Sequence, residues 1–162
     1  MFKSAESALE WAALMKCTEL YKAPVINKMC WKNGSGTNNE LLQGLSQDET
    51  RKQAENIYSI VINLNDLSKC YIQTRYFFND DLRLLASNIK QSVTVNNPEI
   101  LILGYVGKNV THRQIREKLR CNNNKVSEYQ RLVYDHLDRI HYRSLSEIER
   151  RLEDSGLIEK NY

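Results

Sequence analysis

Proline and glycine are scarce in this sequence, which has two prolines and six glycines among its 162 residues. Both residue types interrupt helices, so their scarcity permits long helical segments. Runs that alternate apolar and polar residues with the period of a β-strand are absent from the sequence as well. We therefore expect an all-α protein, organised as a helical bundle.

Long apolar runs are also missing. No stretch approaches the roughly eighteen consecutive apolar residues that indicate a membrane-spanning helix. The N-terminal residues lack the basic-then-apolar order of a secretory signal peptide. We therefore expect a cytoplasmic protein without a membrane partner.

The four cysteines are scattered and form no paired zinc motif; they are Cys17, Cys30, Cys70 and Cys121. Structural zinc sites draw their ligands from closely spaced cysteine or histidine pairs. We expect reduced, buried thiols and assign no metal and no cofactor. A metal site assembled from residues far apart in the sequence is the open alternative.

Residues suited to catalysis are few. All three histidines fall within residues 104–143, and no nucleophile stands beside a base in a recognisable arrangement. The adjacent acidic pairs, at 48–49, 80–81 and 153–154, occupy places where helix caps or exposed helix ends explain them. We expect no enzyme and assign no catalytic residue. A recombinase or nuclease targeted by a DNA-binding segment is a rival interpretation.

The net charge of +3 conceals an uneven distribution along the chain. Residues 1–103 carry eleven basic and eleven acidic side chains, whereas residues 104–143 carry nine basic and four acidic ones. Residues 144–162 carry three basic and five acidic side chains. A basic region of this kind is typical of a protein that contacts nucleic-acid phosphates.

The basic region also contains a pattern of three helices. Pro98 opens the first, which ends before Gly107 and Asn109. Thr111 is a suitable N-cap for the second, and the third follows an asparagine-rich turn and covers 125–142. A short helix, a tight turn and a longer helix with a polar leading end predict a helix-turn-helix that binds double-stranded DNA.

The usual helix-turn-helix template can be aligned with residues 112–131. Its five apolar positions are all acceptably filled, by Ile115, Leu119, Cys121, Val126 and Tyr129. Two positions depart from the template, because Arg116 replaces a preferred small residue and Arg120 replaces a preferred glycine. These departures predict a turn that either avoids the left-handed backbone conformation or adopts it at some cost.

The polar start of the third helix is expected to enter the major groove, where amide, carboxylate and cationic side chains distinguish base edges. The residues assigned to it are Asn123, Asn124, Lys125, Ser127, Glu128 and Arg131. The preceding helix is expected to contact phosphates, which fix register without reading sequence. The residues assigned to it are Thr111, His112, Arg113 and Arg116. The alternative is a three-helix bundle whose polar faces meet only water.

Elsewhere, capping residues and helical spacing predict further helices. These cover 5–22, an apolar segment at 25–31, a long helix opened by a Ser46–Glu49 capping box with a break near 63–66, then 67–78 and 82–92. A glycine- and serine-rich linker is expected at 32–39 and a weak helical turn at 40–45. A last helix is predicted to begin at Ser144 and to end at Gly156.

Three regions follow from this reading: a helical N-terminal region at 1–95, a helix-turn-helix region at 96–143, and a C-terminal capping helix and tail at 144–162. The first region is charge-balanced and rich in apolar and aromatic residues, which suits either a protein-facing surface or a plain core. For Trp11 the sequence allows either role, a contact with another protein or a place in the core. Arg75 stands among aromatic residues at 71–78, which predict cation–π contacts within a core or a surface that stacks on nucleic-acid bases.

Residues 100–140 resemble domain 4 of bacterial primary sigma factors. The resemblance rests on a leucine- and tyrosine-containing helix, a Thr-x-x-x-Ile-x-x-x-Leu helix and a valine that opens the recognition helix. The matching residues are Leu101, Leu103, Tyr105, Thr111, Ile115, Leu119 and Val126. The match covers about a quarter of the chain, and the upstream helices are not those of a sigma factor.

Residues 4–22 and 64–77, taken with the sigma-like segment, are similar to the Q-type transcription antiterminators of lambdoid phages. The resemblance implies a bacteriophage protein that acts in the cytoplasm of the bacterial host during late gene expression. It implies binding to DNA near a late promoter, engagement of a paused RNA polymerase holoenzyme with its sigma factor, and readthrough of terminators. A phage activator or repressor that acts only at initiation is the alternative.

Overall fold

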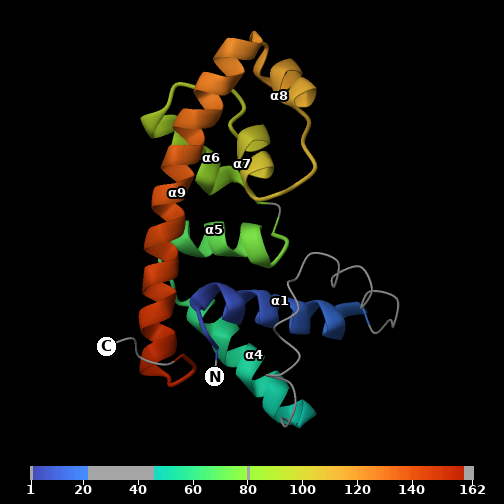
Figure 1. Ribbon diagram of the computed structural model, residues 1–162, viewed down its shortest axis with the longest axis vertical. Helices are drawn as coiled ribbons and strands as arrows, with labels where there is room; N and C mark the ends of the chain where they lie inside the picture. The colour runs from blue at the N-terminus through green and yellow to red at the C-terminus, as the bar shows by residue number, and fades with distance from the viewer. Residues whose placement is uncertain (1, 22–45, 80, 159–162) are drawn as a thin grey trace. The chain divides into compact units, whose positions relative to one another are not determined.

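Figure 1 shows a computed structural model of the protein, which describes residues 2–79, without 22–45, and residues 81–158. The described residues form seven helices and no β-strand, apart from an isolated bridge between Phe2 and Ile158. The prediction of an all-α protein is confirmed. The apolar segment predicted at 25–31, the linker at 32–39 and the turn at 40–45 lie outside the described residues.

The chain divides into two compact units, one formed by residues 1–63 and 145–162 and the other by residues 64–144. The second unit contains the predicted helix-turn-helix. It begins well before residue 96, where the sequence placed the start of that region, because α5 packs on α6, α6 on α7 and α7 on α8.

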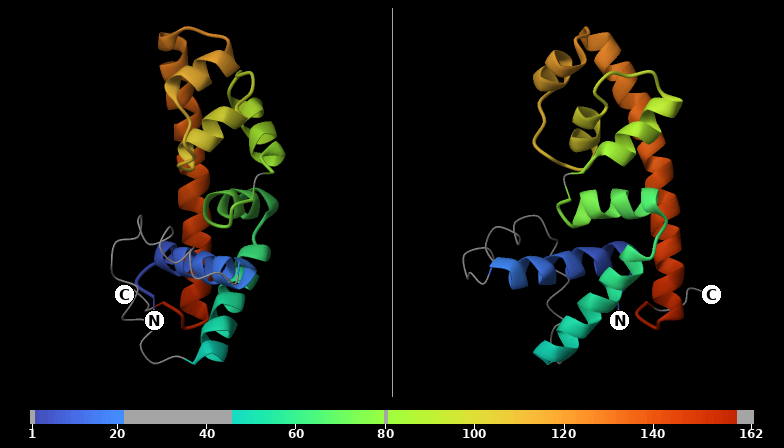
Figure 2. Two further views of the ribbon diagram at one scale, coloured as in Figure 1. Left: turned by 90° about the vertical axis from the view of Figure 1, so that its right-hand side faces the viewer. Right: turned by 180° about the vertical axis from the view of Figure 1, so that it is seen from behind.

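In the first unit, α1 (Ala5–Tyr21) packs against α4 (Gln47–Ile62), and Figure 2 shows the two helices crossing in both views. Trp11 is buried, with its ring centroid 5.2 Å from that of Phe2, which places it in the core of this unit. The predicted capping box is present: Ser46 accepts from the Glu49 amide, and Glu49 accepts from the Ser46 amide. Both hydrogen bonds of the capping box predicted at 46–49 are therefore present.

The second unit is built from α5 (Asp66–Tyr76), α6 (Arg83–Ser92), α7 (Glu99–Tyr105), α8 (His112–Leu119) and the first two thirds of α9 (Asn123–Asp154). The predicted break after α4 is present, since Asn65 caps α5 by accepting from the Ser68 amide. The core of this unit is apolar and fully or almost fully buried; it includes Leu85, Ile89, Leu101, Ile102, Ile115, Leu119, Val126, Val133 and Leu137.

The aromatic segment of α5 contributes mainly to packing. Tyr71 is completely buried, and the Arg75 guanidinium lies 5.7 Å from the ring centroid of Tyr76 and 5.8 Å from that of Tyr105. These distances confirm the predicted cation–π contacts. Phe78, in contrast, is 63% exposed and adopts a left-handed backbone with φ of 56°.

The predicted end of the recognition helix at Tyr142, with a new helix starting at Ser144, is wrong: α9 runs without interruption from Asn123 to Asp154. Ser144 is buried inside the helix, where its hydroxyl donates to the Ile140 carbonyl at 2.7 Å. A serine followed by glutamate resembles a capping box, but a mid-helix serine satisfies its hydroxyl by bonding back one turn instead. Gly156 ends α9 in a left-handed conformation, as predicted, with φ of 72°.

Two smaller expectations also need correction. The cap expected from residues 79–81 is incomplete, because the residue preceding α6, Leu82, makes no side-chain cap; the Asp81 carboxylate accepts from the Arg83 amide instead. Cys70 and Cys121 are free thiols, but both are half-buried rather than buried. Within the described residues no helix is long and apolar enough to cross a membrane, and no three metal-ligating side chains converge.

Candidate nucleic-acid interface

The start of α8 is fixed by a reciprocal pair of hydrogen bonds. The Gln114 amide donates to Thr111 Oγ1 at 3.3 Å, and the Thr111 amide donates to Gln114 Oε1 at 2.8 Å. Two amide groups that would otherwise lack partners at the helix start are satisfied in this way. Ile115 and Leu119 are buried, so the helix presents one apolar edge to the unit and its polar side chains to solvent.

The turn after α8 adopts the left-handed conformation at Arg120, with φ of 52° and ψ of 47°. This decides between the two turns that the sequence left open: the chain accepts the left-handed residue although no glycine is present. Asn97 supports the same turn, because its side-chain amide donates to the Lys118 carbonyl at 3.0 Å. The direction in which the chain leaves α8 is therefore set by Arg120 and Asn97.

Asn122 caps the start of α9, the helix that the sequence predicts to read DNA. Its side-chain oxygen accepts from the Lys125 amide at 2.9 Å, and its carbonyl accepts from the Val126 amide at 3.0 Å. The helix thus starts at Asn123, two residues before the predicted start, and Asn123 and Asn124 belong to its first turn. Val126 is completely buried and holds this end of α9 to the core.

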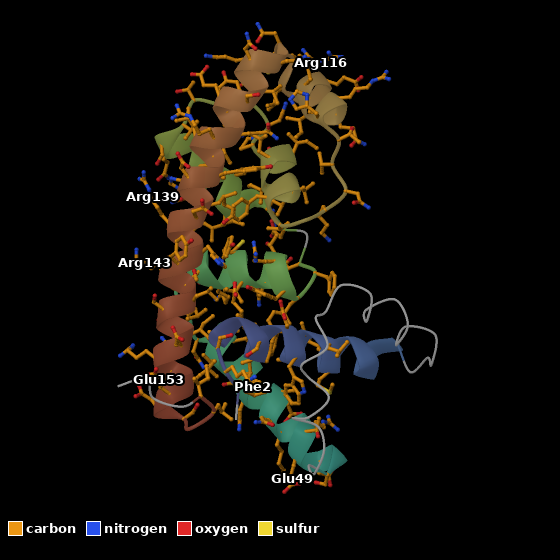
Figure 3. The ribbon with its side chains drawn as sticks, in the orientation of Figure 1. Phe2, Glu49, Arg116, Arg139, Arg143 and Glu153 are labelled. Carbon is orange, nitrogen blue, oxygen red and sulfur yellow. The ribbon has the colours of Figure 1, made fainter. Side chains whose placement is uncertain are left out.

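All ten residues assigned to DNA from the sequence are exposed. Exposure is what a DNA contact requires, while the contacts themselves stay a prediction. Figure 3 shows Arg116 on α8, close to the start of α9. Arg116 occupies the template position that prefers a small residue, and its exposed side chain avoids any steric conflict between the two helices. The residues lie on α8, on the first turns of α9 or, for Thr111, at the cap; they are Thr111, His112, Arg113, Arg116, Asn123, Asn124, Lys125, Ser127, Glu128 and Arg131.

Both acidic residues of this surface are already paired. Glu117 accepts from Arg113 at 2.8 Å, and Glu128 accepts from Lys125 at 2.9 Å. The hydrogen bond to Glu128 raises the pKa of Lys125, which keeps its charge. Because Glu128 holds Lys125, neither side chain can reach a base edge until this exposed ion pair opens, which costs little in water.

Four cations of the same surface, in contrast, form no ion pair with any residue that the structure describes: Arg116, Lys118, Arg120 and Arg131. With the two acidic residues neutralised by Arg113 and Lys125, residues 111–131 hold these four positive charges uncompensated. Lys118 and Arg120 were not assigned to DNA from the sequence, and neither was Asn122. The sequence did carry a signal for them, namely their place inside the basic region.

A shallow hollow of about 520 Å³ adjoins the end of α8. It is bordered by the start of α7, by residues 109–110 and by one side of α8. Six of its eight lining residues are polar or charged, and the lining consists of Asn97, Ile100, Asn109, Val110, Gln114, Glu117, Lys118 and Arg120. The hollow therefore brings two of the four unpaired cations to one side of the turn.

Polar contacts hold α9 to the neighbouring helices α6 and α7. Tyr105 of α7 donates to Asp138, and its ring stacks edge-on to Tyr134 with centroids 5.2 Å apart. From α6, Asn88 Oδ1 lies 2.7 Å from Nε2 of His136. Gly104 allows α7 to lie close to Tyr134 of α9, because a Cβ atom at position 104 would be 3.0 Å from the Tyr134 hydroxyl. These contacts fix α9 along the helices that precede it.

Burial raises the pKa of Tyr105 above its ordinary value, and the hydrogen bond to Asp138 adds to that shift because it favours the protonated phenol. Burial also raises the pKa of Tyr71, whose hydroxyl lies 3.0 Å from Nδ1 of His141. Both phenols are therefore neutral near pH 7. Inside the unit both phenols serve as hydrogen-bonding groups and not as ionisable groups.

Comparisons of this chain with protein families, with curated protein sequences and with solved structures found no significant match.

Proposed function

We propose that the protein is a sequence-specific DNA-binding transcription antitermination factor. In this role it loads onto promoter-proximally paused RNA polymerase and allows the enzyme to read through terminators in phage late transcription. The observation that carries the proposal is the surface of α8 and the first turns of α9, which holds four unpaired cations, one of them in the left-handed residue of the turn. The proposed role is that of a binding protein, not of an enzyme.

The DNA-binding part follows from the distribution of charge and of polar side chains. Uncompensated cations release counterions from the phosphate backbone, which supplies affinity without sequence preference. The first turns of α9 add exposed amide, hydroxyl and cationic groups of the kind that distinguish bases in the major groove. Arg131 is exposed and unpaired, so it is our first candidate for a base contact, most simply with guanine.

The polymerase part of the proposal rests on the resemblance to sigma domain 4 and to the Q-type antiterminators. An antiterminator needs one surface for DNA and another for polymerase. We assign the second surface to the N-terminal region at 1–95, which is charge-balanced. A factor that acts only at initiation would have the same DNA surface, so the two roles differ in transcription and not in binding.

The DNA-binding proposal is tested by selecting a preferred duplex from a random pool with the full chain and then measuring its affinity for variants. We expect Arg131→Ala and Lys125→Ala each to cost about 1–3 kcal/mol of binding free energy if they contact bases. Arg83→Ala is the matched control, because it removes the same charge from α6, where Arg83 pairs with Asp81. Unchanged affinity in both recognition-helix variants would refute the proposed interface in favour of polar helices that meet only water.

The antitermination proposal needs a separate assay. Purified RNA polymerase holoenzyme would transcribe a template that carries the selected site near the promoter and a terminator downstream, with and without the protein. We expect full-length transcripts to increase only when the site is present. Altered initiation without readthrough would instead favour the alternative, an activator or repressor.

A further inference from the structure

Arg120 occupies a backbone conformation that arginine rarely adopts. Its φ of 52° and ψ of 47° lie in the left-handed region, which disfavours every residue with a Cβ except asparagine and aspartate. Asn97, the other left-handed residue near this turn, is of a tolerant type and uses its side chain in a hydrogen bond to Lys118. Arg120 is exposed, and its guanidinium has no partner among the described residues, so no contact within the fold explains the choice of arginine.

The surroundings of Arg120 indicate what its side chain could bind. Lys118 and Arg120 line the same hollow, together with the side-chain amides of Asn97 and Asn109. Glu117, the acidic residue of that lining, is held by Arg113. The hollow therefore presents two uncompensated cations beside Asn109, and cationic donors of this kind match a phosphate oxygen.

The turn also lies close to the base-reading side chains. Arg120 precedes Asn123 by three residues, so their Cα atoms are within about 11 Å of each other. His112, Arg113 and Arg116, which the sequence assigned to phosphates, precede Lys118 along α8. A phosphate bound at the turn would be a separate contact on the same duplex.

We propose that Lys118 and Arg120 bind a second phosphate of the DNA backbone at the turn, and that the left-handed Arg120 is retained for this contact. The inference rests on the proposed DNA-binding function and deepens it. The left-handed conformation itself is the C-cap of α8, where the Arg120 amide donates to the Arg116 carbonyl. Glycine is the usual residue at such a cap, and a strained residue in its place is typical of a functional site. Glycine would relieve the strain here, and it would also remove the guanidinium.

The test compares Arg120→Gly, Arg120→Lys and Lys118→Gln in the full chain, with the selected duplex and a salt titration. One lost phosphate contact lowers the slope of log affinity against log salt by about 0.9, which corresponds to about tenfold weaker binding at 0.1 M salt. We expect this loss for Arg120→Gly and Lys118→Gln, with a midpoint of thermal unfolding no lower than wild type for Arg120→Gly. Arg120→Lys keeps the charge and should retain the wild-type slope.

Phe78→Gly is the matched control for the backbone. Phe78 is left-handed and exposed, like Arg120, but it lies in the loop after α5. The Phe78 ring also lies 5.5 Å from the Lys108 ammonium, so the variant loses that contact together with the strain, and we expect it to bind DNA as wild type does. Unchanged affinity and slope in both Arg120→Gly and Lys118→Gln would overturn the inference, as would a lower unfolding midpoint for Arg120→Gly. If Arg131→Ala still weakens binding when the inference has been overturned, the proposed DNA-binding function stands. If the wild-type chain binds no duplex, the inference and the proposed function are both refuted.

Discussion

The phenol of Tyr105 on α7 donates a hydrogen bond of 2.5 Å to the carboxylate of Asp138 on α9. Both side chains are half-buried, so water cannot fully replace either partner. The bond ties α9 to α7, about two helical turns beyond Arg131, the last of the proposed base-reading residues. The orientation of α9 is thus set by contacts remote from the candidate interface.

We expect Tyr105→Phe to lower the free energy of unfolding by about 1–3 kcal/mol, since it leaves a partly buried carboxylate without its donor. Tyr142→Phe is the matched control, because Tyr142 is 69% exposed and should lose almost nothing. Urea unfolding followed by circular dichroism measures both. Equal losses in the two variants would contradict the role of the Tyr105–Asp138 bond.

The raised pKa of Tyr105 predicts a weakening of the fold at alkaline pH. Its pKa in the folded protein lies above the value of about 10 for an unfolded chain. The stabilisation is therefore complete below pH 10 and is lost as pH rises further, because the unfolded state then releases a proton that the folded state retains. The unfolding free energy should fall less steeply between pH 9 and pH 11 in Tyr105→Phe than in wild type. The fall that remains in the variant comes from Tyr71, whose pKa is also raised. Parallel curves would exclude this contribution.

Asn122→Ala should destabilise the start of α9, because the Lys125 amide loses the side-chain oxygen that caps it. The expected cost is about 1 kcal/mol of unfolding free energy. Asn122→Ser keeps a capping oxygen and should remain within a few tenths of a kcal/mol of wild type. Amide hydrogen exchange at 123–126 reports on this end directly. Faster exchange in both variants alike would mean that the cap is not what fixes the helix start.

Leu145→Pro distinguishes a continuous α9 from two helices that meet at Ser144. Proline would be well tolerated as the first residue of a new helix capped by Ser144. Within the continuous helix it removes a backbone hydrogen bond and clashes with the preceding turn, at a cost of about 3 kcal/mol or more. Leu145→Ala controls for the lost side chain. Similar stability in the two variants would argue against an unbroken helix.

Local sequence signals placed most helix starts correctly. The Ser46–Glu49 box, the break at 63–66 and the cap at Thr111 all involve side chains that bond to backbone within three or four residues. Such contacts depend on neighbouring residues alone, which is why sequence reasoning finds them. The asparagine-rich turn predicted before residue 125 is shorter than expected, because Asn122 is the cap and Asn123 and Asn124 already belong to α9.

The same local logic failed at Ser144. The serine-to-glutamate spacing there matches a cap, but the apolar positions Ile140, Ile148 and Leu152 continue the helical stripe across it. A long helix forms because it can bury that stripe along its whole length, and burial of several apolar side chains outweighs one capping interaction.

The sequence by itself determined that the protein is helical, where its basic residues are concentrated, and which polar side chains stand near the start of α9. These properties follow from composition, spacing and near-neighbour hydrogen bonds. Only the tertiary structure decided that Arg120 accepts the left-handed turn, that Lys118 and Arg120 share a hollow, and that Glu117 and Glu128 are paired while four cations are not. Those outcomes depend on which side chains meet in space, and the Asn97–Lys118 bond joins residues 21 positions apart.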